Sequence, residues 1–315
     1  MKDKFNRDIN YLRISVTDLC NLRCVYCMPK SGIAKKTHGD ILSIEEIEEI
    51  TCAAAECGIT KVRVTGGEPL VRRGITEICR RIAKTPGIRE LCMTTNATLL
   101  PQYAVELKAA GVSRLNISLD TLDRACYKEI TRNGTLDDAL GGIEAAFAAG
   151  FESLKINAVL MGGVNEGDIK GLVALTKRRG VSVRFIELMP IGECERWSRE
   201  RFIGSAIVPK MVPELTETGA EGVATLYRLP DGQGTVGLIS PISSHFCKTC
   251  NRIRITSDGR LKPCLHSEAE INLRGLHGEA LKNTIAEAIL NKPRMHLLGV
   301  EETSRSARNM NAIGG

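Results

Sequence analysis

The sequence predicts an α/β fold, a partial parallel β/α barrel of six units within the first 190 residues. Short β-rich runs alternate with helical patterns from residue 11 to about residue 190, which implies a parallel sheet with right-handed crossovers. This period fits an open doubly wound sheet and a barrel equally well. Strand composition favours the barrel, because parallel strands are normally apolar on both faces, whereas a polar lumen accommodates charged positions. The polar positions are Lys61, Arg63, Asn116, Ser118, Asp120, Lys155, Asn157 and Arg184.

The individual elements follow from their residue patterns. The predicted strands are residues 11–18, 61–66, 90–96, 114–120, 153–161 and 181–189. The predicted helices are residues 43–58, 74–84, 101–110, 124–131, 135–149 and 167–179. The helix over 43–58 has the clearest ends: Ser43 is a typical N-cap, Glu46 completes a capping box, and Gly58 stands at the C-terminal end.

The alternation stops after Pro190. The remaining segments are interpreted as a linker or partial helix (191–215), a β-rich region (223–241), a helix (278–290) and a polar tail that ends in Gly314-Gly315. Two terminal residues without side chains are thin enough to thread into a narrow lumen, so the tail is predicted to enter the active site in the barrel. We therefore predict two parts, a barrel over residues 1–190 and an extension over residues 191–315 that closes the barrel mouth.

Composition and charge narrow the function classes. Only 4% of the residues are aromatic, which argues against a nucleic-acid platform built on stacked rings. The formal charge of +6 allows an acidic partner, although a similar excess is common in proteins that bind no anion. The N-terminus lacks the apolar core of a secretory signal, and no run of about 18 apolar residues exists. We therefore expect a cytoplasmic protein that binds neither membrane nor nucleic acid.

Twelve cysteines in such a chain indicate metal ligation or catalysis rather than disulfides. Cys20, Cys24 and Cys27 share one short loop after the first strand. Three thiolates bind three irons of a 4Fe–4S cube and leave the fourth iron open, and S-adenosylmethionine needs that open iron for its reductive cleavage. A structural zinc site requires four ligands and a ferredoxin loop requires a fourth nearby cysteine; neither fourth ligand is evident.

A second group of three cysteines lies near the C-terminus: Cys247, Cys250 and Cys264. A zinc site that borrows His245 or His266 as its fourth ligand is the structural alternative to a second cluster. Arg252 and Arg254 alternate on one face of the strand predicted to leave this group. Two guanidiniums beside a cluster suggest phosphate recognition.

Several motifs together resemble a known family. They are YLRISVTDLCNLRCVYCMP (11–29), VRVTGGEPL (62–70), TTNATLL (94–100), NISLDTLD (116–123), RFIELMP (184–190), HFCKTCNRIRITSDGRLKPCL (245–265) and the terminal GG. In order and spacing, over essentially the whole chain, they are similar to the GTP 3′,8-cyclases of molybdenum-cofactor biosynthesis, in the radical S-adenosylmethionine superfamily. The first half alone indicates only the superfamily. Ala97 departs from the family, where many relatives have glycine.

The resemblance implies cofactors and residue roles. Each cysteine triplet would hold one 4Fe–4S cluster, the first binding S-adenosylmethionine and the second contacting the guanine of GTP. The positions matching S-adenosylmethionine contacts are Tyr26, Gly67, Ser118 and Met189. The positions matching GTP contacts are Arg13, Lys61, Arg63, Thr94, Lys155, Arg184, Arg252 and Arg254.

The resemblance also implies a reaction and partners. A deoxyadenosyl radical abstracts the 3′ hydrogen of GTP, the ribose radical attacks C8 of guanine, and reduction gives the cyclised dihydroguanosine triphosphate. An external electron donor and handover to cyclic pyranopterin monophosphate synthase are implied, and a homodimer is compatible. Two alternatives stay open. A peptide-modifying radical S-adenosylmethionine enzyme would typically need more auxiliary cysteines, and a two-cluster electron carrier would need neither the barrel nor GGEP.

Overall fold

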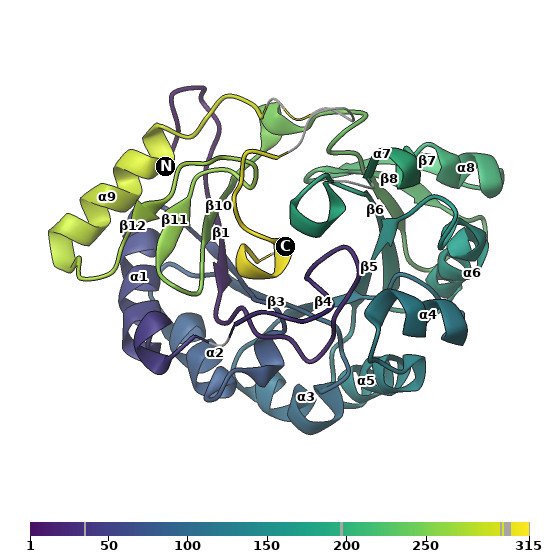
Figure 1. Ribbon diagram of the computed structural model, residues 1–315, viewed down its shortest axis with the longest axis horizontal. Helices are drawn as coiled ribbons and strands as arrows, with labels where there is room; N and C mark the ends of the chain where they lie inside the picture. Colours follow the sequence, from purple (N-terminus) through teal and green to yellow (C-terminus); the bar gives the residue numbers. More distant parts are fainter. Residues whose placement is uncertain (35, 196–197, 297, 299–303, 315) are drawn as a thin grey trace.

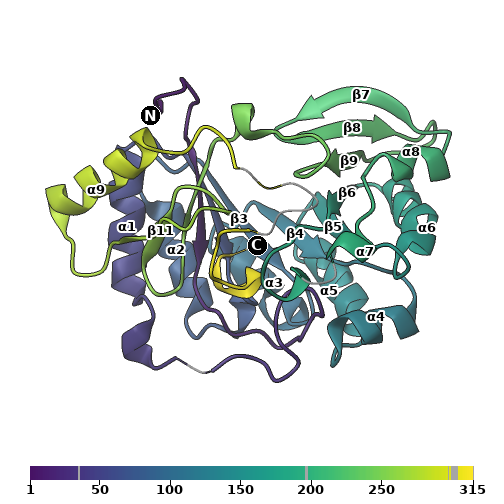
Figure 2. The same cartoon turned by 45° about the horizontal axis from the view of Figure 1, so that its top comes forward.

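The computed structural model describes residues 1–34, 36–195, 198–296, 298 and 304–314. One sheet curves around a central lumen, and most of the helices cover its outer face (Figure 1). The end of the described chain lies inside this ring, as a second view also shows (Figure 2). Among the described residues, no helix combines the length and apolarity needed to cross a membrane.

The six predicted β-α units are confirmed. Their strands are β1 (Tyr11–Ser15), β2 (Lys61–Thr65), β3 (Glu90–Thr95), β4 (Arg114–Ser118), β5 (Leu154–Leu160) and β6 (Val181–Glu187). Their helices are α1 (Ile44–Glu56), α2 (Ile75–Lys84), α3 (Leu100–Ala109), α4 (Arg124–Thr131), α5 (Leu136–Ala148) and α6 (Ile169–Ala174). The last of these is shorter than predicted, because 3-10 turns η3 (Glu166–Asp168) and η4 (Leu175–Lys177) replace its ends.

The C-terminal part of the chain extends the same sheet at both edges. Its elements are α7 (Ser198–Arg201), α8 (Ile207–Met211), β7 (Thr216–Glu221), β8 (Ala224–Arg228), β9 (Val236–Ile239), β10 (Arg252–Ile255), β11 (Arg260–Lys262), β12 (Ile271–Asn272) and α9 (Gly278–Leu290). The remaining 3-10 helices are η1 (His38–Asp40), η2 (Pro69–Val71), η5 (Gly192–Cys194), η6 (Cys247–Thr249) and η7 (Met310–Ala312). The strand order is β12-β11-β10-β1-β2-β3-β4-β5-β6-β9-β8-β7, so the barrel is partial rather than closed.

Strands β9 and β10 lie where β structure was predicted, in the region 223–241 and directly after Cys250. Their places in the sheet were not predicted: β9 pairs parallel with β6, and β10 pairs parallel with β1. Neither pairing follows from the β-α alternation, which stops after Pro190. The division at residue 190 stays a prediction, and the sheet runs across it.

Helix α1 shows how local sequence signals and core packing agree. The Glu46 backbone N–H donates to Ser43 Oγ at 3.0 Å, and Glu46 Oε2 accepts from the Ser43 backbone N–H at 2.7 Å, which is the predicted capping box. Ile47 and Ile50 on the inner face of α1 are buried in the main core. Helix α9 packs on α1, so the C-terminal part also contacts the outer helical layer of the barrel.

The register of the strands places the polar side chains on the lumen face of the sheet. Arg13 on β1 is level with Arg63 on β2 and with Arg254 on β10. Tyr11 is level with Lys61 and Arg252 in the next layer. Level residues of adjacent strands project from the same face of a sheet. The lumen is therefore lined by cations on the β10–β1–β2 side.

Candidate active site

The lumen contains a cavity of about 440 Å³ lined by both parts of the chain. Among the described residues, nine lysine or arginine side chains and the single carboxylate of Glu221 line it. The lining includes seven of the positions predicted to contact GTP: Arg13, Lys61, Arg63, Lys155, Arg184, Arg252 and Arg254. The eighth position, Thr94, lies beside them, and its hydroxyl accepts a 3.3 Å hydrogen bond from Arg63. Such a density of positive charge attracts a polyanion.

Tyr11 organises the cations on the β1 side. Its hydroxyl accepts a hydrogen bond from Arg63 Nε, and its ring centroid lies 5.1 Å from Lys61 Nζ and 5.9 Å from the Arg252 guanidinium. Burial raises the pKa of Tyr11, but the nearby Arg63 and Arg13 cations outweigh burial, and the pKa is lowered. Tyr11 was not among the site residues predicted from the sequence. The available signal was its position two residues before Arg13, on the same face of one strand.

The guanidinium groups beside β1 lie close to one another. Burial, together with the Arg252 cation, lowers the pKa of Arg254 to about 10. Arg252 Nε and Asn116 Oδ1 are buried and have no hydrogen-bond partner within the described part of the chain. A buried polar group without a partner costs about 1–3 kcal/mol. An anionic ligand that also carries hydrogen-bonding groups would therefore stabilise this cavity.

Glu221, at the end of β7, faces the opposite side of the lumen. It pairs with Lys155 at 2.6 Å and with Arg184 at 2.5 Å. Gly237 on β9 makes room for the Arg184 guanidinium, because a Cβ atom there would lie 2.3 Å from Arg184 Nη1. The Glu221 side chain is 47% exposed, so solvent reaches this ion pair from the cavity rim.

The second cysteine triplet lines the same cavity through all three of its members, Cys247, Cys250 and Cys264. Burial disfavours the Cys250 thiolate, but the Lys292 and Arg252 cations outweigh burial and lower its pKa. Lys292 is itself buried and donates a 2.5 Å hydrogen bond to the carbonyl of Pro263, beside Cys264. Cationic surroundings favour the thiolate form that metal ligation requires. Burial, together with the other two thiols, raises the pKa of Cys247. The donor set of three thiols fits an iron–sulfur cluster at this end of the cavity.

The first cysteine triplet lies on the loop after β1, outside the residues that line the cavity. Burial raises the pKa of Cys20 to about 11 and, together with the Cys20 thiol, that of Cys27 to about 12. The Arg23 cation offsets this rise only in part for Cys20, and bound metal ions favour the thiolate forms. The Tyr26 hydroxyl, next to this triplet in sequence, donates to Asp120 Oδ2 at 2.7 Å. The donor chemistry of this loop also fits a 4Fe–4S cluster.

The GGEP segment packs directly on the loop that precedes the first triplet. The Gly67 N–H donates to the Thr17 carbonyl at 2.8 Å, and a Cβ atom on Gly67 would lie 2.4 Å from the Leu19 carbonyl oxygen. Only glycine permits this approach. Glu68 is buried and accepts hydrogen bonds from the Thr95 hydroxyl and from the Asn96 backbone N–H. These two hydrogen bonds join the ends of β2 and β3.

The other two predicted S-adenosylmethionine contacts take different positions. Ser118 ends β4, where it is level with Asn157 on β5. Met189 follows β6 and lines the cavity. The structure thus brings the predicted GTP residues together with the second triplet, while the first triplet lies apart from them.

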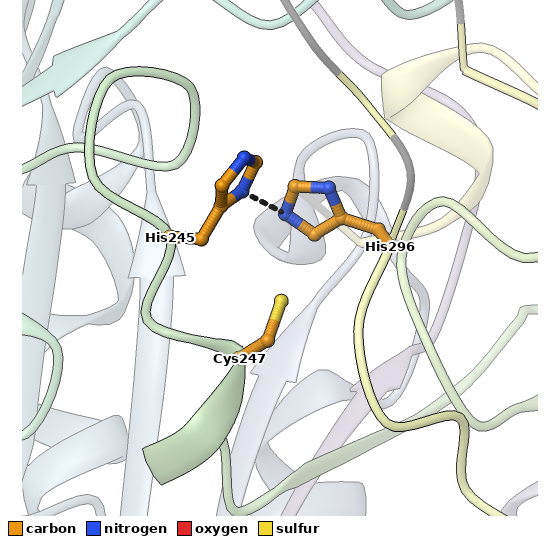
Figure 3. A group of neighbouring side chains, drawn as sticks. All are labelled: His245, Cys247 and His296. Atoms are coloured by element: carbon orange, nitrogen blue, oxygen red, sulfur yellow. Dashed lines mark hydrogen bonds between the residues drawn. The ribbon is translucent and has the colours of Figure 1, made fainter.

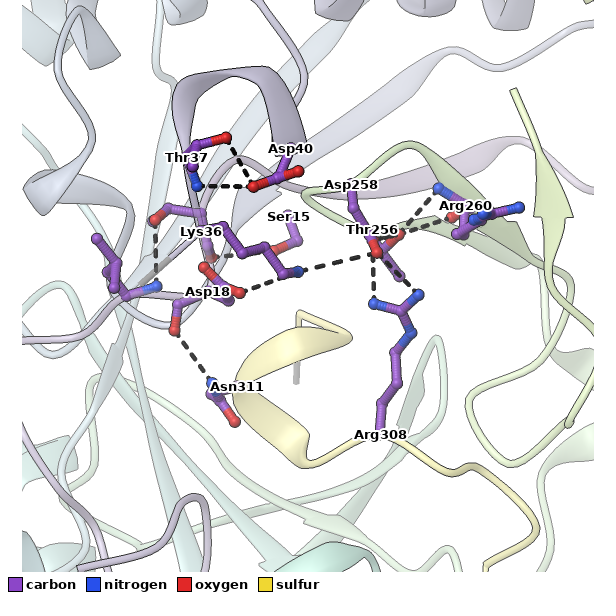
Figure 4. Close-up of polar contacts among 12 residues, drawn as sticks. Ser15, Asp18, Lys36, Thr37, Asp40, Thr256, Asp258, Arg260, Arg308 and Asn311 are labelled. Carbon is purple, nitrogen blue, oxygen red and sulfur yellow. Dashed lines mark hydrogen bonds and ion pairs between the residues drawn. The ribbon is translucent and has the colours of Figure 1, made fainter. Parts of the chain in front are cut away.

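The C-terminal tail runs between the first triplet and the cavity. The Asn311 side chain donates to the Asp18 carbonyl at 3.0 Å (Figure 4), and its backbone N–H bonds to the Cys27 thiol. The Gly314 carbonyl accepts from Arg254 at 2.6 Å and from Arg13 at 3.2 Å. The tail prediction also named Gly315, which lies outside the described residues.

Arg308 anchors this tail to the barrel. Its guanidinium donates two 3.0 Å hydrogen bonds to Asp258 and two 2.7 Å hydrogen bonds to Glu270. Asp258 also lies 3.8 Å from Lys36, which pairs with Asp18 at 3.0 Å (Figure 4). Burial alone would lower the pKa of Arg308, but these carboxylates raise it. Residue 308 is therefore fixed beside the loop that carries the first triplet.

The fold and the three-cysteine loop define the class of protein. The sequence model of the Radical SAM superfamily matches residues 14–176, and the model named Molybdenum Cofactor Synthesis C matches residues 181–298. The GTP 3′,8-cyclase of Alkaliphilus metalliredigens is 51% identical over 320 residues, covering 100% of both chains. That of Peptoclostridium acidaminophilum is 50% identical, covering 99% of this chain and 98% of its own. This chain belongs to the GTP 3′,8-cyclase family of the radical SAM superfamily.

Solved structures agree on the fold at much lower identity. Streptococcus suis SuiB superposes with a TM-score of 0.64 at 17% identity, over 92% of this chain and 68% of that chain. The form bound to its precursor peptide SuiA gives a TM-score of 0.63, also at 17% identity, over 98% of this chain and 70% of that chain. At this identity the likeness supports the radical SAM fold alone.

Proposed function

We propose that this chain converts GTP into (8S)-3′,8-cyclo-7,8-dihydroguanosine 5′-triphosphate. The observation that carries the proposal is the lumen cavity, where the cations predicted to hold a triphosphate and the second cysteine triplet line one continuous space. Seven predicted cations around a triphosphate of about four negative charges is a reasonable excess for binding inside a barrel. Relatives that match over their full length are named for this activity.

The cofactors of the proposal are two 4Fe–4S clusters and S-adenosylmethionine. Cys20, Cys24 and Cys27 hold the first cluster, and Cys247, Cys250 and Cys264 hold the second. When bound, the first cluster and S-adenosylmethionine supply the deoxyadenosyl radical that starts the reaction. The proposed contacts to S-adenosylmethionine are Tyr26, Gly67, Ser118 and Met189.

The chain's own side chains bind and orient GTP in this proposal. Arg13, Arg252 and Arg254 bind phosphate oxygens, because guanidiniums present paired donors to them. The triphosphate is also bound from β2 and β3, by Lys61, Arg63 and Thr94, and from β5 and β6, by Lys155 and Arg184. The guanine lies toward the second triplet. The tail covers the space between GTP and the first triplet and keeps water out of it.

Further parts of the proposal concern the protein's surroundings. An external donor supplies electrons, and the product passes to cyclic pyranopterin monophosphate synthase. The proposed location is the cytoplasm, and the proposal allows a homodimer. The proposed domain division is a barrel (1–190) and an extension (191–315).

Anaerobic reconstitution with iron and sulfide tests the proposal. About eight irons and eight sulfides per chain are expected from two four-iron clusters, and GTP should be consumed when reductant and S-adenosylmethionine are present. Cys24→Ala should abolish cleavage of S-adenosylmethionine, whereas Cys250→Ala should spare some cleavage and eliminate cyclisation. Cys52→Ala, on the outer helix α1, is the matched control. Cleavage of S-adenosylmethionine without consumption of GTP by the unmodified chain would refute the proposed substrate.

A further inference from the structure

Three ligand-type side chains meet at the rim of the cavity, two of them outside the cysteine triplets. The ligand atoms of His245, Cys247 and His296 all lie within 4.8 Å of one another, and in the described part of the chain no other group of three His, Cys, Asp or Glu residues does so. Figure 3 shows His245 and Cys247 on one segment and His296 on a second segment, with the three side chains facing one another. His245 Nδ1 and His296 Nε2 are 3.4 Å apart.

This spacing agrees with the geometry of one tetrahedral metal ion. Zinc–nitrogen bonds of about 2.0–2.1 Å place two ligand nitrogens about 3.3 Å apart at tetrahedral angles. The two histidines therefore stand at a metal-binding separation, with the Cys247 sulfur beside them. His266 does not complete the set. Its ring lies 4.7 Å from that of His296, and its Nδ1 contacts Ser304 Oγ at 3.3 Å.

A buried arginine holds the two ligand-bearing segments together. Arg7 donates to the Cys247 carbonyl at 2.9 Å, and it donates to the carbonyls of Arg294 at 3.0 Å and Pro293 at 2.7 Å, shortly before His296. The same guanidinium pairs with Asp3 at 2.6 Å, and both side chains are almost fully buried. The backbone that presents Cys247 and His296 is thus fixed before any metal binds, which is the preorganisation that a binding site requires.

We propose that His245, Cys247 and His296 bind one divalent transition-metal ion of the zinc or ferrous class whenever the second cysteine triplet carries no cluster. Two imidazoles and one thiolate suit these ions and leave a fourth position for water. The inference rests on the proposed function in one respect: Cys247 also serves the second cluster. In the second cluster the Cys247 sulfur would be bonded to an iron, so we expect metal binding and cluster assembly to exclude each other.

Binding requires one local proton shift. The Leu298 backbone N–H donates to His296 Nδ1 at 3.2 Å, which leaves the proton of the neutral ring on Nε2, facing His245. When the metal takes Nε2, that proton moves to Nδ1 and the Leu298 N–H loses its acceptor. The Cys247 thiol releases its proton to solvent, as thiolate ligation demands.

A cobalt titration of the full-length chain, purified without iron and kept anaerobic, tests the proposal. Co²⁺ substitutes for zinc in such sites and reports thiolate ligation by charge-transfer absorption and tetrahedral geometry by its visible bands. We expect one equivalent of Co²⁺ to bind with both signals. His296→Ala and His245→Ala should each weaken binding at least about tenfold, whereas Cys250→Ala and the exposed, remote His277→Ala should leave it unchanged. Circular dichroism of each variant checks that it is folded.

Two results would overturn the inference. One is the absence of tetrahedral cobalt absorption. The other is loss of that absorption in Cys250→Ala with retention in both histidine variants, which would place the ion on the cysteine triplet instead. After reconstitution with iron and sulfide the cobalt signal should disappear, and its persistence beside eight irons would disprove mutual exclusion. None of these titrations contains GTP, so a failure of the proposed cyclisation would be seen separately.

Discussion

Arg254 donates a 2.6 Å hydrogen bond to the carbonyl oxygen of Gly314, and this contact ties the end of the described chain to the strand beside β1. Gly314 is packed so closely that a Cβ atom would lie 2.2 Å from Thr65 Oγ1. Arg254 is also a proposed phosphate ligand. The Nη1 of Arg254 makes the contacts with the tail, so in the proposed function the other donors of this guanidinium can hold a phosphate oxygen at the same time.

Removing the end of the tail should separate binding from chemistry. Deletion of Gly314 and Gly315 should leave both clusters, the fold and GTP affinity largely intact, while product formation collapses, because the tail no longer closes the space beside the first triplet. Product is measured by chromatography and affinity by equilibrium binding. Turnover at the level of the full chain would mean that these two glycines are only a chain end.

Arg308→Ala offers a second route to the same prediction without shortening the chain. Loss of its contacts with Asp258 and Glu270 should release the tail and reproduce the effect of the deletion. Arg305→Ala is the matched control, because Arg305 carries the same charge three residues earlier and is exposed. Equal losses in both variants would point to net charge rather than to the anchor.

Arg252 should contribute directly to GTP affinity. Its Nε has no hydrogen-bond partner among the described residues, so a phosphate oxygen would gain a charge-assisted hydrogen bond there. Arg252→Ala should weaken GTP binding by about 1.5–3 kcal/mol and leave binding of S-adenosylmethionine nearly unchanged. Isothermal titration measures both ligands. Arg124→Ala, which removes an exposed arginine on α4, is the control, and equal losses for both ligands would assign Arg252 to the barrel structure.

Asp120 should make stability depend on pH. Burial raises its pKa to about 6 from an ordinary 3.8, although Val159 N–H and the Tyr26 hydroxyl donate to it. Between these values the folded chain keeps a proton that the unfolded chain has lost. The free energy of unfolding therefore falls as pH rises through this window, by up to about 3 kcal/mol, and the loss persists at higher pH.

The variant Asp120→Asn should abolish this pH-dependent contribution. The free energy of unfolding in urea is measured for the metal-free wild type and variant at about pH 4 and about pH 7. The contribution of Asp120 is the wild-type value minus the variant value at each pH. That difference should decrease toward pH 7. Asp137→Asn, at an exposed carboxylate on α5, should show no comparable trend. A difference for Asp120→Asn that is constant with pH would contradict the burial argument.

Local patterns predicted most of the barrel. The Ser43 cap and the β-α period depend on residues close in sequence, and the charged strand positions Lys61 and Arg63 signalled a polar lumen before any geometry was known. The pairing of β9 with β6 and of β10 with β1 could not be predicted, because no periodic pattern encodes contacts between segments so distant in sequence.

The site residues likewise fall into those that local patterns predicted and those that they did not. All seven predicted GTP cations share a cavity, since strand alternation fixes which face they occupy. His296 beside Cys247 was not foreseen, because Arg7 brings their segments together only in the folded chain. The tail was predicted to enter the lumen, but its anchor was not, since Arg308 and Asp258 are 50 residues apart.

Glu221 should compete with GTP for two of the proposed phosphate ligands. Its carboxylate pairs with Lys155 at 2.6 Å and Arg184 at 2.5 Å, so a phosphate can take these cations only after Glu221 leaves. Because the side chain is 47% exposed, water screens the pair, and its contribution is about 0.2–1 kcal/mol. Glu221→Gln should therefore raise GTP affinity, by up to about fivefold. Glu217→Gln, on the same strand but hydrogen-bonded to Tyr227, makes the same charge change without freeing either cation. A fall in affinity specific to Glu221→Gln would show instead that Glu221 positions Lys155 and Arg184 for the substrate.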